Sequence, residues 1–192
     1  MHRRSSIRSI VGLAILTNKI HAGVLRSRQD VAATEYFGSL YCYGEGIQGL
    51  PVYYANEIAM VGVQLVAEVG VATNVTFDDP KSTTTLTVTA NETKSLQANT
   101  FFIDATPGAN QAAGFVSPAN NSDSLTTSGF RLYGNQLAWV SGIGELEQKF
   151  WAKPSATDGV YTLIWNVDAI AADGAVPVNV KNVAPVTVGS VA

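Results

Sequence analysis

Residues 130–166 read FRLYGNQLAWVSGIGELEQKFWAKPSATDGVYTLIWN, and this segment contains two pairs of short strands, each pair joined by a turn. In the first pair, Gly134 and Asn135 separate two apolar runs and readily supply the positive φ angle of a two-residue hairpin turn. In the second pair, residues 150–152 stop at Lys153 and Pro154, and residues 160–165 return after the loop at 155–159. The segment therefore predicts a chain built from antiparallel hairpins.

The rest of the chain from Glu35 onward repeats this kind of short apolar and aromatic run. Residues 84–89 alternate most clearly, with Leu86 and Val88 on one face and threonines on the other. Asn56 and Glu57 separate two runs, at 51–55 and 58–63, that predict another hairpin. Further strands are expected at 36–43, 64–71, 75–77, 101–103, 114–116 and 176–180, and only 167–172 is a candidate for a helical turn. We therefore predict a single all-β domain spanning 35–192.

An aromatic residue stands three positions before a proline in three places. These are Phe77 before Pro80, Phe115 before Pro118 and Trp151 before Pro154, so the prolines are 38 and then 36 residues apart. Self-similarity at a period of about 20–50 residues usually reflects repeated structural units. Three units of about 40 residues in an all-strand chain favour a β-trefoil-like barrel, which leaves no open sheet edge. A two-sheet antiparallel β-sandwich is the alternative.

The N-terminus has the three-part layout of a secretory signal peptide. Basic residues including Arg3 and Arg4 precede an apolar run at 10–16, and small residues follow at Ala22 and Gly23. We expect residues 1–22 to be a signal peptide and residues 23–34 to be a short linker or pro-segment. An amphipathic N-terminal helix is the alternative. Signal removal predicts a secreted protein, located outside the cell or in the cell wall.

Removal of residues 1–22 makes the mature chain acidic. That segment holds four of the 12 basic residues and none of the 15 acidic ones, which leaves 8 − 15 = −7. Nucleic acid is therefore not an expected partner, because phosphate binding needs clustered Lys and Arg. The sequence also has no stretch of 18 or more apolar residues, so no membrane association is expected after signal removal.

Both histidines, His2 and His21, leave with the predicted signal peptide. The mature domain then has no Ser-His-Asp or Cys-His nucleophile system and no histidine-based zinc site. The close acidic pairs, Asp78 with Asp79 and Glu145 with Glu147, are interpreted as a solvated turn and a strand rim. Residues 104–108 (DATPG) resemble an aspartic-protease signature only superficially and occur once. We expect a non-enzymatic protein with no catalytic residue, cofactor or metal.

Cys42 is the only cysteine of the chain. An unpaired thiol in a secreted protein indicates an intermolecular disulfide, a reactive group or a buried apolar residue. Because Cys42 lies between Tyr41 and Tyr43 in a strand-like run, burial is the expectation. The domain is then held together by its core without disulfides, and a monomer is expected rather than a disulfide dimer.

Four short segments carry a family resemblance. Residues 36–38 (YFG), 132–137 (LYGNQL), 150–152 (FWA) and 163–166 (LIWN) together resemble small secreted fungal cell-wall proteins of the phialide (PhiA-like) type. The resemblance covers roughly residues 36 to 185 in order. It implies a secreted, non-enzymatic protein associated with the hyphal or conidial wall, and it brings no catalytic residue with it.

Three sequons provide candidate glycosylation sites, at Asn74, Asn91 and Asn120. Asn91 and Asn120 fall in polar segments where we expect a glycan to be accommodated. Asn74 borders a predicted strand, where the strand is expected to hinder a glycan.

Three functions of different classes are compatible with the sequence. The first is a structural protein of the fungal cell wall or extracellular matrix, whose partner is a wall polysaccharide or an extracellular protein. The second is a secreted effector in which the loops at 105–112 and 119–128 inhibit a host protease. The third is a carbohydrate-binding module that stacks Trp139, Trp151 or Trp165 on sugar, although large aromatics on alternating strand positions are more often core residues.

Overall fold

The computed structural model describes residues 36–66, 70–78, 84–92, 95–120, 122–171 and 173–186, which all lie within one compact unit. The predicted signal peptide at 1–22 and linker at 23–34 lie outside these residues. About half of the described residues are in strands and 2% are helical. The expected all-β class is therefore confirmed.

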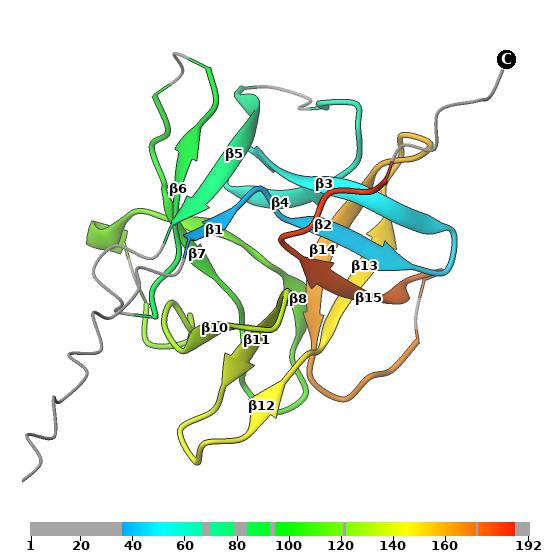
Figure 1. Ribbon diagram of the computed structural model, residues 1–192. Coiled ribbons are helices and arrows are strands. Elements are labelled where there is room, and N and C mark those ends of the chain that lie inside the picture. The colour runs from blue at the N-terminus through cyan, green and yellow to red at the C-terminus, as the bar shows by residue number, and fades with distance from the viewer. Residues whose placement is uncertain are drawn as a thin grey trace, which may run out of the picture. The chain divides into compact units, whose positions relative to one another are not determined.

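The described residues form fifteen strands and one 3-10 helix, numbered as in Figure 1. They are β1 (Tyr36–Gly38), β2 (Tyr41–Gly44), β3 (Ile47–Ala55), β4 (Ile58–Val61), β5 (Ala72–Asp78), β6 (Thr87–Ala90), β7 (Thr100–Phe102), β8 (Asn110–Ala112), β9 (Gly114–Val116), η2 (Pro118–Asn120), β10 (Phe130–Tyr133), β11 (Gln136–Val140), β12 (Leu146–Glu147), β13 (Phe150–Pro154), β14 (Tyr161–Asn166) and β15 (Val176–Lys181).

Ten of these strands close into an antiparallel barrel. The hydrogen-bonded ring runs β5-β6-β7-β9-β4-β14-β13-β15-β2-β3 and returns to β5. Strand β1 adds to β5, β8 adds to β14, and β10, β11 and β12 form an extension that joins the barrel where β11 meets β15 (Figure 1). Closure pairs the backbone N–H and C=O groups that the edge strands of an open sheet would expose. The architecture is therefore a closed barrel and not the two-sheet sandwich considered as the alternative.

The hairpins predicted from residues 130–166 are confirmed. Tyr133 pairs with Gln136 across a two-residue loop, and Gly134 has a φ angle of 62°. Strands β13 and β14 pair from Phe150 opposite Trp165 to Pro154 opposite Tyr161. Local turn chemistry and apolar alternation were sufficient here, because the two strands of each pair are adjacent in sequence.

The hairpin predicted around Asn56 and Glu57 is also confirmed. Both residues have positive φ angles, 49° and 68°, which is the backbone of a type I′ turn. The first strand, β3, begins at Ile47 and is longer than expected, because its first half pairs with β2 while its second half pairs with β4 and β5.

Three sequence-based element predictions are wrong in detail. The strand expected at 36–43 is interrupted at Ser39 and Leu40, where the Leu40 carbonyl accepts a hydrogen bond from Val52 N at 2.8 Å. In the segment expected as a strand at 64–71, the described residues 64–66, 70 and 71 are not in a strand. In the segment expected as a strand at 84–89, β6 begins only at Thr87. Thr84 has a φ angle of 66°, and its Oγ1 and carbonyl accept bonds from Gly129 N and Phe130 N.

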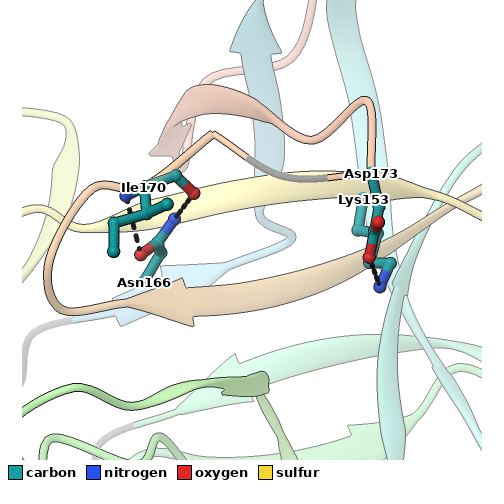
Figure 2. A network of polar contacts seen from close by, with 4 residues as sticks. All are labelled: Lys153, Asn166, Ile170 and Asp173. Carbon is teal, nitrogen blue, oxygen red and sulfur yellow. Dashed lines mark hydrogen bonds and ion pairs between the residues drawn. The ribbon is translucent and has the colours of Figure 1, made fainter.

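The helical turn expected within 167–172 is not found in the described residues 167–171. The Asn166 side chain is buried and bonds to the Ile170 backbone, and Figure 2 shows these two contacts. Asn166 Nδ2 donates to Ile170 O at 2.8 Å, and Ile170 N donates to Asn166 Oδ1 at 3.2 Å. Asn166 competes with a helix because its amide can satisfy nearby backbone groups in a non-helical conformation.

A group of phenylalanines fills the barrel. Phe101 contacts Phe130, Phe115, Phe77 and Phe150, with ring centroids 5.2, 5.8, 5.9 and 6.5 Å apart, and all five rings are buried. Burying one such side chain stabilises a fold by roughly 1.5–3 kcal/mol. Aromatic burial, in place of disulfides, therefore holds this part of the barrel together.

The aromatic-proline pattern is only partly reproduced in the core. Phe77 and Phe115 lie in the main cluster with centroids 6.2 Å apart. Trp151 instead packs in a separate cluster with Ile164 and Ala175, and its neighbour Phe150 enters the main core. Two of the three predicted equivalent aromatics thus share an environment.

Candidate functional site

The cysteine and the carboxylates singled out in the sequence take part in packing, ion pairing and turn formation. Cys42 is fully buried in the main core, and this burial raises the pKa of its thiol. Its predicted burial is confirmed. Glu147 forms an ion pair with Lys149 at 2.6 Å, while Glu145 is exposed at the preceding turn. Asp104 Oδ1 accepts hydrogen bonds from Thr106 N at 3.0 Å and Thr106 Oγ1 at 2.6 Å, so this carboxylate orders a turn.

The other acidic pair is only partly within the described residues. Asp78 ends β5, and Asp79 lies outside them. Across the described residues, no three Asp, Glu, His or Cys side chains lie close enough to hold a metal ion. In the same part of the chain, no helix is long and apolar enough to cross a membrane.

All three sequon asparagines are exposed, including Asn74 in the middle of β5. The sequence predicted that the strand would hinder Asn74, but its side chain points away from the core because it alternates with buried Thr73 and Val75. Asn91 Oδ1 accepts a hydrogen bond from Thr76 Oγ1 at 2.8 Å, and Thr76 belongs to the Asn74 sequon. The first two sequons are therefore neighbours on one face of the β5–β6 pair.

The tryptophans proposed as sugar platforms serve mainly as packing residues. Trp165 is fully buried, and its ring meets Phe150 edge-on at 4.8 Å and Trp139 edge-on at 6.2 Å. Trp151 is buried too. Trp139 is partly buried, and its Nε1 donates to Ser128 O at 3.0 Å. The expectation that these aromatics are more often core than platform is confirmed for Trp165 and Trp151.

The two predicted inhibitory loops are partly tied into the fold. In 105–112, residues 110–112 form β8 against β14, and Val167 N donates to Ala109 O. In 119–128, Thr126 forms a bridge with Ile103. The residues of these two segments that are exposed and outside strands and the 3-10 helix are 106–108, 122–124 and 128.

A groove of about 880 Å³ lies between segments far apart in sequence. We call it the tyrosine groove. It is lined by residues of β2, β3, the β10–β11 hairpin and β15 and by residues 183–186, and the side chains used below are Tyr43, Gln48, Tyr133, Asn135 and Lys181. This volume is in the range of small-molecule and cofactor sites, which is roughly 300–1,000 Å³.

Hydrogen bonds and one cation–π contact hold the tyrosine groove together. Lys181 Nζ lies 5.3 Å from the centroid of the Tyr43 ring. Tyr43 Oη donates to Val183 O at 2.7 Å, and Asn182 N donates to Asn135 O at 3.1 Å. Burial, and next the charge of Tyr41, raise the pKa of Tyr43, so its hydroxyl stays protonated and can keep donating.

Sequence reasoning missed the tyrosine groove. The one available signal was Tyr133, a large aromatic beside a two-residue turn, where a side chain is readily exposed. The other components come together only because β15 pairs with β2, which places Asn179 opposite Tyr43. No local pattern links those two strands.

No family model, curated protein or solved structure matches this chain. The functional argument therefore depends on the residues of the chain itself.

Proposed function

We propose that the protein is a secreted, non-enzymatic component of the fungal cell wall or extracellular matrix that is retained there by wall polysaccharide. The tyrosine groove is the observation that carries this proposal, because it combines an exposed aromatic ring with amide side chains. Aromatic rings and a few polar groups are the usual means by which proteins hold uncharged ligands. The predicted signal peptide and the PhiA-like segments support the extracellular location.

The test of this proposal is retention on polysaccharide and in the wall. The purified mature domain is mixed with insoluble glucan and with chitin, and the bound fraction is measured after sedimentation. We expect retention on at least one polymer, and recovery of the native protein in the wall fraction of the fungus. A protein that stays wholly in solution with both polymers and is absent from the wall fraction would rule the proposal out.

The extracellular location has its own test. The N-terminus of protein recovered from the culture medium or wall is determined by Edman degradation or mass spectrometry. We expect it at Gly23, or later within 23–34 if a pro-segment is also removed at Arg26 or Arg28. Recovery of a chain that still carries residues 1–22 would contradict secretion through a cleaved signal.

The second candidate function is inhibition of a host protease. It is favoured by the exposed loop at 106–108, which Asp104 orders through its two hydrogen bonds to Thr106. A pre-ordered loop loses less entropy on entering an active-site cleft. A panel of papain-like, subtilisin-like and trypsin-like proteases tests it: inhibition that disappears on substitution within 106–108 or 122–124 supports this function, and no inhibition removes it.

The trefoil-like organisation of the barrel is a separate structural proposal. The aromatic residues of the three aromatic-proline segments lie in β5, β9 and β13. Each of these strands is the fourth after the previous one in chain order, which supports the proposal. A β-trefoil consists of three equivalent four-stranded units. A crystal structure tests it, and failure of β5, β9 and β13 to superpose under one three-fold rotation would overturn it.

A further inference from the structure

We propose that the tyrosine groove binds an uncharged wall polysaccharide, with the Tyr133 ring stacked on the face of one sugar. This inference rests on the proposed function and adds that the polysaccharide is uncharged and that Tyr133 makes the main contact. The site uses Tyr43, Gln48, Tyr133, Asn135 and Lys181, all of which line the groove.

The first step of the argument is the Tyr133 ring. Tyr133 is 72% exposed, although burial of a large aromatic side chain is normally favourable. Its backbone is part of a hairpin, because Tyr133 pairs with Gln136 at the end of β10 next to the Gly134 turn. An exposed tyrosine ring can cover the apolar C–H face of a pyranose, and it has only two χ angles to restrict on binding.

The second step is the polar lining. Gln48 and Asn135 are exposed and line the same groove as Tyr133, and each amide has both a donor and an acceptor. Sugar hydroxyls also donate and accept. The two side-chain amides can therefore exchange hydrogen bonds with sugar hydroxyls, and neither the protein group nor the sugar needs to be ionised.

The third step concerns charge. Among the described residues that line the groove, Lys181 carries the only charge, and it lies over the Tyr43 ring. The Tyr43 ring therefore already provides a favourable electrostatic partner for the positive charge of Lys181. The absence of a carboxylate from the described lining disfavours a cationic ligand such as deacetylated chitin, and the engagement of Lys181 makes an uncharged ligand the better match than an acidic one.

The fourth step is preorganisation. Residues 183–186 form one wall of the groove, and Val183 O and Asn182 N bond to Tyr43 and Asn135. Pro185 packs so closely over Gly49 that a Cβ atom at Gly49 would lie 2.6 Å from Pro185 Cβ. The groove is therefore present before a ligand arrives, which reduces the cost of binding.

Affinity electrophoresis of the mature domain tests the inference. The probes are a soluble β-glucan, a soluble chitin oligomer and polygalacturonate as an acidic polymer. We expect retardation by at least one uncharged probe, with little change on raising the salt concentration, because screening affects charged contacts. The expected effect of Tyr133→Ala is a loss of about tenfold in affinity, whereas Tyr133→Phe, which keeps the ring, retains most of it.

Matched variants separate binding from folding. Ile143 is 82% exposed on the β11–β12 turn and does not line the groove, so Ile143→Ala controls for loss of an exposed apolar side chain. Gln48→Ala tests the polar lining and is expected to weaken binding by a smaller factor than Tyr133→Ala. Circular dichroism and urea midpoints of all variants verify that the barrel is intact.

The outcomes distinguish the inference from the proposed function. If the wild-type protein binds polysaccharide and Tyr133→Ala binds equally well, the groove is not the site, while retention by the wall stands. If only polygalacturonate binds, and high salt abolishes binding, the uncharged ligand class is wrong. If none of the three probes binds, the inference is wrong, while attachment to the wall is decided separately by sedimentation with insoluble glucan and chitin and by the wall fraction.

Discussion

The chemistry of Cys42 is determined by its position in the core. It lies in the middle of β2, opposite Leu50 of β3 and Val180 of β15, and is fully buried. A thiolate is the reactive form of cysteine, and apolar surroundings raise the pKa and suppress that form. The lone cysteine therefore contributes packing to the barrel.

The first prediction is that Cys42 is unreactive in the native protein. A thiol reagent such as DTNB should label less than a tenth of the protein under native conditions, and one equivalent after denaturation in guanidinium. Non-reducing electrophoresis should show a monomer. Rapid, stoichiometric labelling of the native protein would show that the thiol is accessible.

The pH dependence of stability follows from the same burial. The pKa of Cys42 is raised in the folded state, so the protein keeps its full stability below the unfolded thiol pKa of about 8.5 and loses some as pH rises above it. In Cys42→Ala this contribution is absent, so we expect a flatter dependence of the unfolding free energy between about pH 8 and 10. Urea titrations at several pH values measure the difference, and identical slopes for both proteins would contradict it.

At the scale of the element, the turn between β3 and β4 contains a residue, Glu57, that does not favour the backbone conformation it adopts. Glu57 occupies a φ angle of 68°, a conformation in which a side chain costs roughly 1–2 kcal/mol. Type I′ turns favour the order Asn-Gly, and Asn56 already supplies the first residue. The Glu57 carbonyl also accepts a hydrogen bond from Phe115 N at 2.7 Å, which connects this turn to β9.

We therefore predict that Glu57→Gly stabilises the protein. The expected gain is about 0.5–1 kcal/mol in the free energy of unfolding, because relief of the strained backbone exceeds the added entropy of an unfolded glycine. Urea denaturation measures it. Glu45→Gly is the matched control: Glu45 is in the β2–β3 turn without a positive φ angle, so glycine there should destabilise. Loss of stability in Glu57→Gly would contradict the argument.

The loop after β14 is held at its two ends by contacts of different kinds (Figure 2). Asn166 is buried and bonds twice to the Ile170 backbone. Lys153 and Asp173 form an exposed ion pair at 2.7 Å. Buried hydrogen bonds are costly to break because the partner groups lose solvation, whereas exposed ion pairs contribute little.

We predict that Asn166→Ala destabilises the protein by about 1–3 kcal/mol, and that Lys153→Ala has a much smaller effect.

The Lys153 hydrogen bond, and next its charge, lower the pKa of Asp173 in the folded state. The contribution of the pair is therefore present above the unfolded carboxyl pKa and is lost as pH falls through the lowered folded value. Wild type and Lys153→Ala should converge in urea midpoint at low pH, while the Asn166→Ala deficit should persist. An Asn166→Ala midpoint equal to that of wild type would show that the two bonds do not stabilise the loop.

At the scale of the whole molecule, closure of the barrel joins distant segments into one core. The main cluster includes residues from β1 to β15, and Trp165 lies fully buried within it. Such a core predicts one cooperative unfolding transition. Tryptophan fluorescence and far-ultraviolet circular dichroism should give the same urea midpoint. Separate midpoints would indicate that the β10–β12 extension unfolds independently of the barrel.

The sequence by itself determined the all-β class, the hairpins around Gly134 and Asn56, the strand pair β13–β14 and the burial of Cys42 and Trp165. These features depend on turn conformation and apolar alternation within about 20 residues, which local sequence encodes. Only the tertiary structure decided that β15 lies between β2 and β13, that the ring closes, and that Lys181 lies over Tyr43. The β2–β15 pairing joins strands more than a hundred residues apart, and the period-two pattern of a strand contains no information about which distant strand it pairs with.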